Sequence, residues 1–196
     1  MKDIEYIPPK VQTPLGERKI LLHTCCAPCS SAILECLIHN GLQPTIYYYN
    51  PNIHPFDEYE KRMVECRRYA EKLGVEMIEE KYDHEEWLEC VQGLENAPER
   101  GPRCLECFKM RLLKAAEYAS AHDFKVLTTT LASSRWKSLE QINEAGKWAV
   151  NQVEGVVWWD QNWRKEGLQP RRGEIIKEMN FYNQLYCGCE YSRNNI

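Results

Sequence analysis

The stretch Lys19-Ile-Leu-Leu-His-Thr-Cys-Cys-Ala-Pro-Cys-Ser30 joins an apolar run to three cysteines within five positions. Its first part, Lys19–His23, is short and apolar, which is typical of a buried strand. From Ser30 to Asn40 the apolar residues have helical spacing, and Gly41 predicts where that helix ends. The stretch therefore predicts a strand, a cysteine-bearing turn and a helix in direct succession.

The same alternation continues along the chain. We expect further strands at Thr45–Tyr49, Val75–Glu79, Phe124–Thr129 and Val156–Trp159. Helices are predicted at Phe56–Leu73, Glu85–Gln92, Pro102–His122, Ser138–Val153 and Glu174–Tyr182. Strands that alternate with helices indicate an α/β fold, with a mostly parallel sheet and helices on both faces. The length of 196 residues suits a single domain over 1–196, in which residues 1–17 form an extended N-terminal arm.

The residues with reactive side chains fall in loops that follow the predicted strands. These loops are 25–30, 50–55, 128–137 and 160–165. In a parallel sheet, ligands bind outside the carboxyl ends of the strands. We therefore expect one edge of the sheet to carry the functional site.

The composition is that of an ordinary globular chain, with 43% hydrophobic and 28% charged residues. No stretch approaches the roughly 20 apolar residues of a membrane helix. The N-terminal residues 1–10 lack the apolar core and cleavage site of a secretory signal. We expect a cytoplasmic protein without a membrane partner, whose cysteines stay reduced.

The net charge of −4 does not indicate a nucleic-acid-binding protein. Basic residues nevertheless gather locally, at Arg100, Arg103, Lys109, Arg111 and Lys114, at Arg135 and Lys137, and at Lys165, Arg171 and Arg172. They could form a face that binds phosphates, or they could belong to ordinary solvated helix faces.

Seven of the ten cysteines lie in three short clusters, which are Cys25-Cys26-Ala-Pro-Cys29, Cys104-Leu-Glu-Cys107 and Cys187-Gly-Cys189. Close spacing brings several sulfurs together before any long-range folding, as metal binding or redox chemistry requires. Gly188 lets the backbone turn tightly between two of these sulfurs. The other three, Cys36, Cys66 and Cys90, lie in amphipathic helices and are expected to be buried core residues.

The number of clustered thiols bears on the kind of metal centre. A zinc site takes four thiolates, which any two clusters would supply. Seven thiolates exceed one zinc site, and an iron–sulfur cluster with a second metal centre uses them better. Zinc alone stays an alternative. A redox-active Cys26-Ala-Pro-Cys29 pair of the thioredoxin type is another, since a helix N-terminus lowers the pKa of a thiol.

A few other residues are candidates for the site. Asp160 ends a predicted strand and could ligate a metal or deliver a proton, or it could be a solvated or capping aspartate. Residues 128–130 are threonines that could bind a sugar or phosphate, although β-propensity explains the first two better. His23 is expected to support the cysteines. Most tryptophans and tyrosines are expected to fill the core, although some could stack on a base.

Several segments occur in one order along residues 19–192. They are His23-Thr-Cys-Cys-Ala-Pro-Cys-Ser30, Tyr49-Asn-Pro-Asn-Ile53 with Glu58-Tyr-Glu-Lys-Arg62, Gly93-Leu-Glu-Asn96, Arg103-Cys-Leu-Glu-Cys-Phe108 with Arg111, Thr128-Thr-Thr-Leu131, and Tyr186-Cys-Gly-Cys-Glu-Tyr-Ser192. In this combination the chain resembles the cobalamin-independent epoxyqueuosine reductases. The similarity covers nearly the whole chain.

The resemblance implies the last step of queuosine synthesis, in which epoxyqueuosine at the wobble position of a tRNA with a GUN anticodon loses its epoxide oxygen. It implies an adenine-nucleotide-hydrolase-like, Rossmann-like fold with a helical cysteine-rich part. It also implies a 4Fe-4S cluster, with Cys25, Cys26, Cys104, Cys107, Cys187 and Cys189 as candidate ligands. A mononuclear metal, iron or zinc, is implied beside it, with Cys29 and Asp160 added to the ligand set. The implied catalytic residues are Cys25, Cys26 and Asp160, and the electron donor is an unidentified partner.

Two segments depart from the family pattern. Ser133-Ser-Arg-Trp-Lys-Ser138 stands where relatives commonly show Ser-Pro-x-Lys-Asn. Asp160-Gln-Asn-Trp-Arg-Lys-Glu-Gly167 differs from the usual Asp-Phe-Lys-Lys pattern. We expect the contacts to the tRNA or to the modified base to differ at these segments.

Three rival functions make different predictions. An ATP-using tRNA-thiolating enzyme would need a glycine-rich phosphate loop after the first strand, and residues 24–30 contain no glycine. A thiol–disulfide oxidoreductase would use only Cys26 and Cys29 and would be active without metal. A zinc-stapled binding module would be colourless and would unfold with a chelator.

Overall fold

Five parallel strands form the centre of the protein, in the order β3-β2-β1-β4-β5. The computed structural model describes residues 6–193. The strands are β1 (Lys19–His23), β2 (Gln43–Tyr48), β3 (Met77–Glu79), β4 (Val126–Thr129) and β5 (Val157–Trp158). The predicted α/β class is confirmed, and every pair of neighbouring strands in this sheet is parallel.

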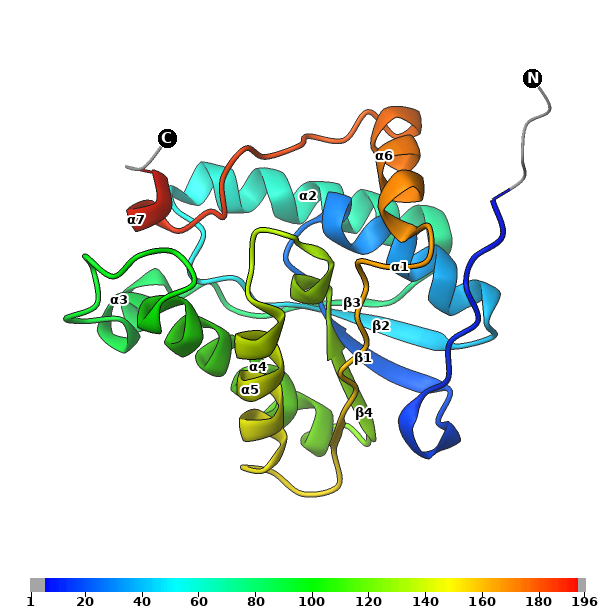
Figure 1. Ribbon diagram of the computed structural model, residues 1–196, viewed down its shortest axis with the longest axis horizontal. Coiled ribbons are helices and arrows are strands. Elements are labelled where there is room, and N and C mark those ends of the chain that lie inside the picture. Colours follow the sequence, from blue (N-terminus) through cyan, green and yellow to red (C-terminus); the bar gives the residue numbers. More distant parts are fainter. Residues whose placement is uncertain (1–5, 194–196) are drawn as a thin grey trace.

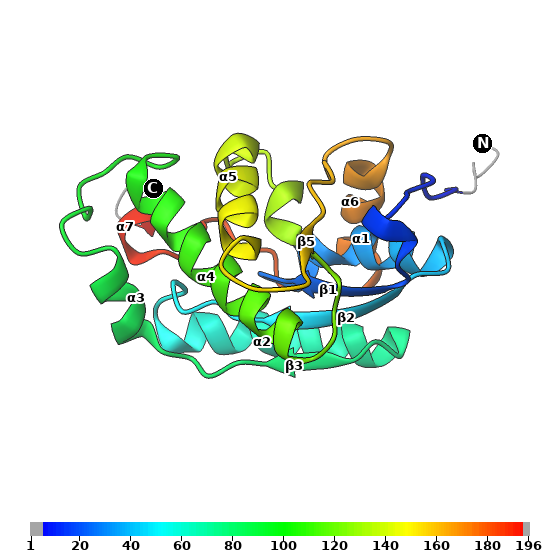
Figure 2. The ribbon, with the colours of Figure 1, turned by 90° about the horizontal axis from the view of Figure 1, so that it is seen from below.

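Helices cover both faces of the sheet (Figures 1 and 2). On one face lie α1 (Ala27–His39), α2 (Phe56–Leu73) and α6 (Leu168–Glu178). On the other lie α4 (Pro102–Ala121) and α5 (Leu139–Val150). Two short helices, α3 (His84–Cys90) and α7 (Glu190–Arg193), lie side by side at one end of the molecule. No helix in the described part of the chain is long and apolar enough to cross a bilayer.

The strand order places a topological switch point between β1 and β4. From β1 the chain moves outward through β2 to β3, and it then crosses to β4 on the other side of β1. The loops leaving two neighbouring strands at such a point turn in opposite directions and open a crevice at their carboxyl ends, where ligands bind in α/β proteins. The first cysteine cluster follows β1, and Thr130 follows β4, so both lie at this crevice.

Two helices begin earlier than the sequence predicts. The helix expected from Ser30 begins at Ala27, because Cys26 has an extended backbone (φ −173°, ψ 159°) and a proline fits the first helical turn. The helix expected at 174–182 runs from Leu168 to Glu178, after Gly167 with φ 81°. Cys29 therefore lies in the first turn of α1. Helix α7 was not predicted.

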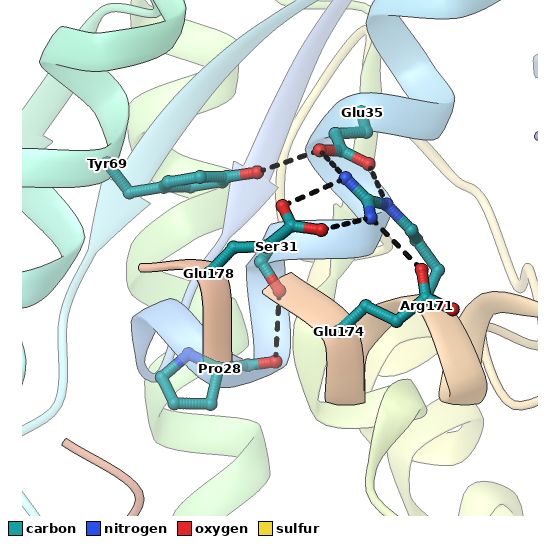
Figure 3. A network of polar contacts seen from close by, with 7 residues as sticks. All are labelled: Pro28, Ser31, Glu35, Tyr69, Arg171, Glu174 and Glu178. Carbon is teal, nitrogen blue, oxygen red and sulfur yellow. Dashed lines mark hydrogen bonds and ion pairs between the residues drawn. The ribbon is translucent and has the colours of Figure 1, made fainter. Parts of the chain in front are cut away.

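An ion-pair network joins α6 to α1 (Figure 3). Arg171 on α6 lies 2.8 Å from a carboxylate oxygen of Glu35 on α1, and it also pairs with Glu178 at 2.7 Å and Glu174 at 3.0 Å. The next residue, Arg172, donates from Nε to the carbonyl of Pro28 at 2.7 Å. The network therefore holds α6 against the helix turn that carries the first cysteine cluster.

Two further contacts hold the N-terminal arm and α5 in place. The arm is anchored on the end of α1, because Asn40 donates to the Pro9 carbonyl at 2.9 Å and accepts from the Val11 N–H at 3.2 Å; residues 1–5 of the predicted arm lie outside the described residues. At the opposite edge, the Trp158 ring lies directly against the backbone of Gly146 on α5, where any Cβ would overlap the ring. That glycine lets α5 pack closely on β5.

Candidate metal centre

The thiols of Cys25, Cys26 and Cys29 converge at the switch point. Their sulfurs all lie within 4.8 Å of one another, and they form the only such group of three or more histidine, cysteine or acidic ligand atoms in residues 6–193. Cys26 and Cys29 are buried, while Cys25 is half-buried. The group is therefore compact and largely screened from water.

Hydrogen bonds orient the first two thiols. The Thr130 hydroxyl lies 3.5 Å from Cys25 Sγ and accepts from the Cys25 N–H at 3.2 Å. Gln184 donates from Nε2 to Cys26 Sγ at 2.7 Å. Hydrogen bonds from Cys26 and Cys29 lower the pKa of the Cys25 thiol well below its usual value, whereas burial raises the pKa of Cys26. Cys25 is thus the readiest thiolate of the three.

The cysteines of the second and third clusters form a second group of thiols, where the start of α4 meets the C-terminal segment that precedes α7. Cys104 accepts from the Arg100 N–H at 3.3 Å. Cys107 and Cys189 are both buried in one small apolar cluster with Trp87 and Val91. Burial raises the pKa of Cys104 and of Cys189 to about 11, and the nearby charge of Cys187 adds to it. The second and third clusters of the sequence therefore meet in space.

Arg62 holds the C-terminal segment in place. Its guanidinium donates to the carbonyls of Cys187 at 3.0 Å and Tyr186 at 3.3 Å, and it pairs with Glu58 at 2.7 Å. Gly188 has φ 104°, and a Cβ there would lie 2.9 Å from both Arg62 Nη1 and Ile53 Cγ1. Only glycine fits this turn, which keeps Cys187 and Cys189 near the start of α4.

Lys137 links the two groups of thiols electrostatically. Burial lowers the pKa of Lys137, but the negative charges of Cys187, Cys25 and Cys29 outweigh burial and raise it. The lysine is half-buried in the segment between η2 (Thr130–Ser133) and α5. The charge of one lysine is therefore coupled to cysteines of the first and the third cluster.

Asp160 lies elsewhere. Its carboxylate is 59% exposed and lies 4.0 Å from Lys147 Nζ, on the surface beside α5. It does not belong to the group formed by Cys25, Cys26 and Cys29 within the described residues. Asp160 is positioned as a solvated carboxylate, and its predicted role as ligand or proton donor has no contact in the structure to support it.

Other predicted candidates are structural. His23 is buried, with Nδ1 2.7 Å from Thr129 Oγ1 and Nε2 3.2 Å from the Tyr49 carbonyl, so both ring nitrogens are engaged. The hydroxyl of Thr128 donates to the Trp159 carbonyl at 2.9 Å. Of the threonine run, only the third member contacts a cysteine of the site.

Two of the basic residues around α4 lie neither on a phosphate-binding face nor on a solvated helix face. Arg103 and Arg111 are each only 1% exposed. Arg103 donates to backbone carbonyls of the preceding loop, including that of Glu95 at 2.7 Å, and Arg111 binds the Asn50 side chain. Arginines usually lie at the surface, so these two looked like surface charges. They are buried instead, and Arg111 Nη1 lies 4.0 Å from Cys107 Sγ.

The three isolated cysteines differ from one another. Cys36 and Cys66 are buried in the main core, as predicted. Cys90 is half-buried and packs beside the apolar cluster that contains Cys107 and Cys189.

Sequence reasoning did not find Gln184, since a lone glutamine in a loop carries no pattern. The long-range contact with Cys26 reveals it.

Comparison with known proteins identifies the family. A family model described as Epoxyqueuosine reductase QueH matches residues 20–195. The chain belongs to the epoxyqueuosine reductase QueH family. It is 49% identical over 187 residues to Epoxyqueuosine reductase QueH of Haemophilus influenzae, a match that covers 95% of this chain and 76% of the relative.

More distant members of the family match over similar lengths. Epoxyqueuosine reductase QueH of Acinetobacter baylyi is 47% identical over 183 residues, covering 93% of this chain and 84% of the relative. That of Dehalococcoides mccartyi is 34% identical over 176 residues, covering 89% and 92%. The resemblance seen in the motifs is confirmed, and the chain is an oxidoreductase of the QueH family.

Proposed function

We propose that this protein reduces epoxyqueuosine to queuosine at the wobble position of tRNAs with a GUN anticodon, in the cytoplasm. The observation that carries the proposal is the compact group of Cys25, Cys26 and Cys29 at the switch point of the sheet. A switch point is where α/β proteins bind ligands. The family match supplies the substrate class, since relatives at up to 49% identity are named for this reduction.

The residues present fit a metal centre. Ten cysteines are all free thiols, and seven of them form the two groups described above. Clustered thiolates are the soft ligands that iron–sulfur clusters and zinc prefer. We propose that Cys25, Cys26, Cys29, Cys104, Cys107, Cys187 and Cys189 hold a 4Fe-4S cluster and a mononuclear metal, iron in preference to zinc. Asp160 is left out because its carboxylate is exposed beside Lys147.

Removal of the epoxide oxygen consumes two electrons and two protons, and it yields the alkene and one water. When bound, the two metal centres would supply electrons singly and a Lewis acid for the epoxide oxygen. The chain itself contributes a cation at Lys137, which offsets the negative charge of the thiolates. It also contributes the Thr130 hydroxyl, which orients Cys25. The electrons come from an external donor.

Anaerobic purification followed by iron and acid-labile sulfide analysis tests the metal assignment. We expect about four sulfides and four to five irons per chain. Protein that holds only zinc and no sulfide would overturn it and would favour the zinc-stapled binding module. Full activity in metal-free protein would favour the thiol–disulfide oxidoreductase.

The reaction itself is tested with tRNA that carries epoxyqueuosine. The tRNA is incubated anaerobically with the protein and dithionite, then digested to nucleosides and analysed by mass spectrometry. We expect a loss of one oxygen, 16 mass units, from the modified nucleoside. A Cys25→Ala variant should give none of this product, since it removes the readiest thiolate.

A further inference from the structure

Trp136 is exposed in a protein whose other tryptophans are mostly buried. Its exposed fraction is 68%, and it lies in the segment between η2 and α5. Of the remaining five, four are buried and Trp148 is 37% exposed. A single exposed apolar residue is common on protein surfaces, so exposure alone shows nothing. The surroundings of Trp136 are what distinguish it.

Two arginines fix the backbone on either side of this ring. Arg100, from the loop before α4, donates to the Trp136 carbonyl at 3.0 Å and to the Arg135 carbonyl at 3.2 Å. Arg164, from the loop after β5, donates to the Lys137 carbonyl at 2.8 Å. The ring is therefore presented to solvent on a braced segment. A preordered segment loses less conformational entropy when it binds a partner.

The segment is also positively charged. The Arg135 guanidinium lies 5.1 Å from the centroid of the Trp136 ring. Between residues 6 and 193, no carboxylate pairs with Arg100, Arg135 or Arg164. Burial lowers the pKa of Arg164, and the like charge of Arg100 lowers it further. The positive charge here is uncompensated, which suits a partner that carries negative charge.

The same segment adjoins the candidate metal centre. The N–H of Arg100 donates to Cys104 Sγ at 3.3 Å, while the side chain of Arg100 holds the Trp136 backbone. The next residue, Lys137, has its pKa raised by the negative charges of Cys187, Cys25 and Cys29. Trp136 therefore lies on a segment that Arg100 joins to the second group of thiols.

We propose that Trp136 and Arg135 form a stacking platform for an unpaired base of the RNA substrate next to the base that is reduced. The inference rests on the proposed function, because it takes tRNA as the substrate. Unpaired bases stack on aromatic rings and arginine planes in RNA-binding proteins. Flanking arginines pair with the phosphates of the same strand. A protein partner would need an apolar surface around the ring, whereas here the neighbours are arginines.

The test uses anaerobically purified full-length protein and a fluorescein-labelled RNA anticodon stem-loop with a GUN anticodon, measured by anisotropy. Loss of one base–aromatic stack in Trp136→Ala should weaken binding about 5- to 150-fold. Trp136→Phe keeps a ring and should stay within a few-fold of wild type. Trp148→Ala is the matched control, because Trp148 is also an exposed tryptophan with a cation, Lys109, 5.8 Å from its ring centroid.

The salt dependence of binding distinguishes the contribution of Trp136 from that of Arg135. Trp136→Ala should keep the wild-type dependence of log Kd on log salt, since stacking releases no counterions. Arg135→Gln should lower the slope by about 0.7, the value for one phosphate contact on a single strand. If the wild-type protein binds the stem-loop and Trp136→Ala binds it with the same Kd, the platform is overturned and the proposed function still stands. A wild-type protein that binds no stem-loop removes the proposed function, and the platform with it.

Discussion

Replacement of Arg62 by Met should loosen the C-terminal cysteines and destabilise the whole domain. The guanidinium is 3% exposed and joins Glu58 on the same helix to the backbone at Cys187. Removing one partner of a buried pair leaves the other charge buried and unpaired, which costs about 3–5 kcal/mol. The Glu58 side chain is 9% exposed and keeps one hydrogen bond, from the Tyr182 hydroxyl at 2.8 Å, so most of this penalty applies. It compares with a total stability of about 5–15 kcal/mol.

The expected shift in melting temperature follows from the size of the chain. A domain of about 150–250 residues loses roughly 2–4 °C for each kcal/mol. Arg62→Met should therefore melt about 6–20 °C below wild type, as measured by circular dichroism on anaerobically purified protein. The iron content per chain should also fall, because Cys187 and Cys189 lose the contact that holds their turn.

The matched control lies one turn further along the same helix. Arg67 pairs with Glu79 at 2.7 Å, but the two side chains are 44% and 32% exposed. Exposed pairs contribute at most about 1 kcal/mol, so Arg67→Met should shift melting by less than about 4 °C and leave iron unchanged. In the double variant Glu58→Gln, Arg62→Met, neither charge of the pair stays buried, so its melting temperature should lie above that of Arg62→Met alone. Equal melting of Arg62→Met and Arg67→Met would refute the reasoning.

Three further predictions concern Gly188, Cys36 and Asp160. Gly188→Ala should lower the iron content and cost about 1–3 kcal/mol of stability, because Gly188 has φ 104° and the new Cβ would lie only 2.9 Å from Arg62 and Ile53. The control Gly173→Ala in α6 meets no atom within 4 Å and should gain about 0.5–1 kcal/mol in the same thermal unfolding measurements. Burial raises the pKa of Cys36 to about 11, so about one thiol in a thousand is ionised at pH 8. Iodoacetamide at pH 8 should leave Cys36 unmodified in native protein, and rapid labelling would contradict its burial. Asp160→Asn should retain wild-type iron, because the carboxylate is exposed beside Lys147; iron loss would reinstate Asp160 as a ligand.

Local pattern was sufficient for the framework of the fold. The five strands were predicted within a few residues, because short apolar runs between turn residues are a strong local signal. Helix starts were less accurate. The start of α1 depends on the extended backbone of Cys26, and that of α6 on the positive φ of Gly167, neither of which shows in an apolar pattern.

The site was predictable only as far as its parts are close in sequence. Neighbouring cysteines such as Cys25 and Cys26 are together in any fold, so the clusters and the family resemblance follow from the sequence alone. The pairing of Cys107 with Cys189 is different, because the two are far apart along the chain and meet in a small buried cluster. Arg62 makes that meeting possible from a helix that carries no cysteine of the site.

The sequence by itself determined the class of fold, the family and the three sets of thiols, since each rests on residues adjacent in the chain or on motifs in a set order. The tertiary structure alone decided which charges are inside and which aromatic ring is outside. Arg103 and Arg111 are buried beside the thiols, while Asp160 and Trp136 face solvent. Local spacing indicates which face of a helix is apolar, but whether a charged or aromatic side chain is covered depends on which distant elements pack against it.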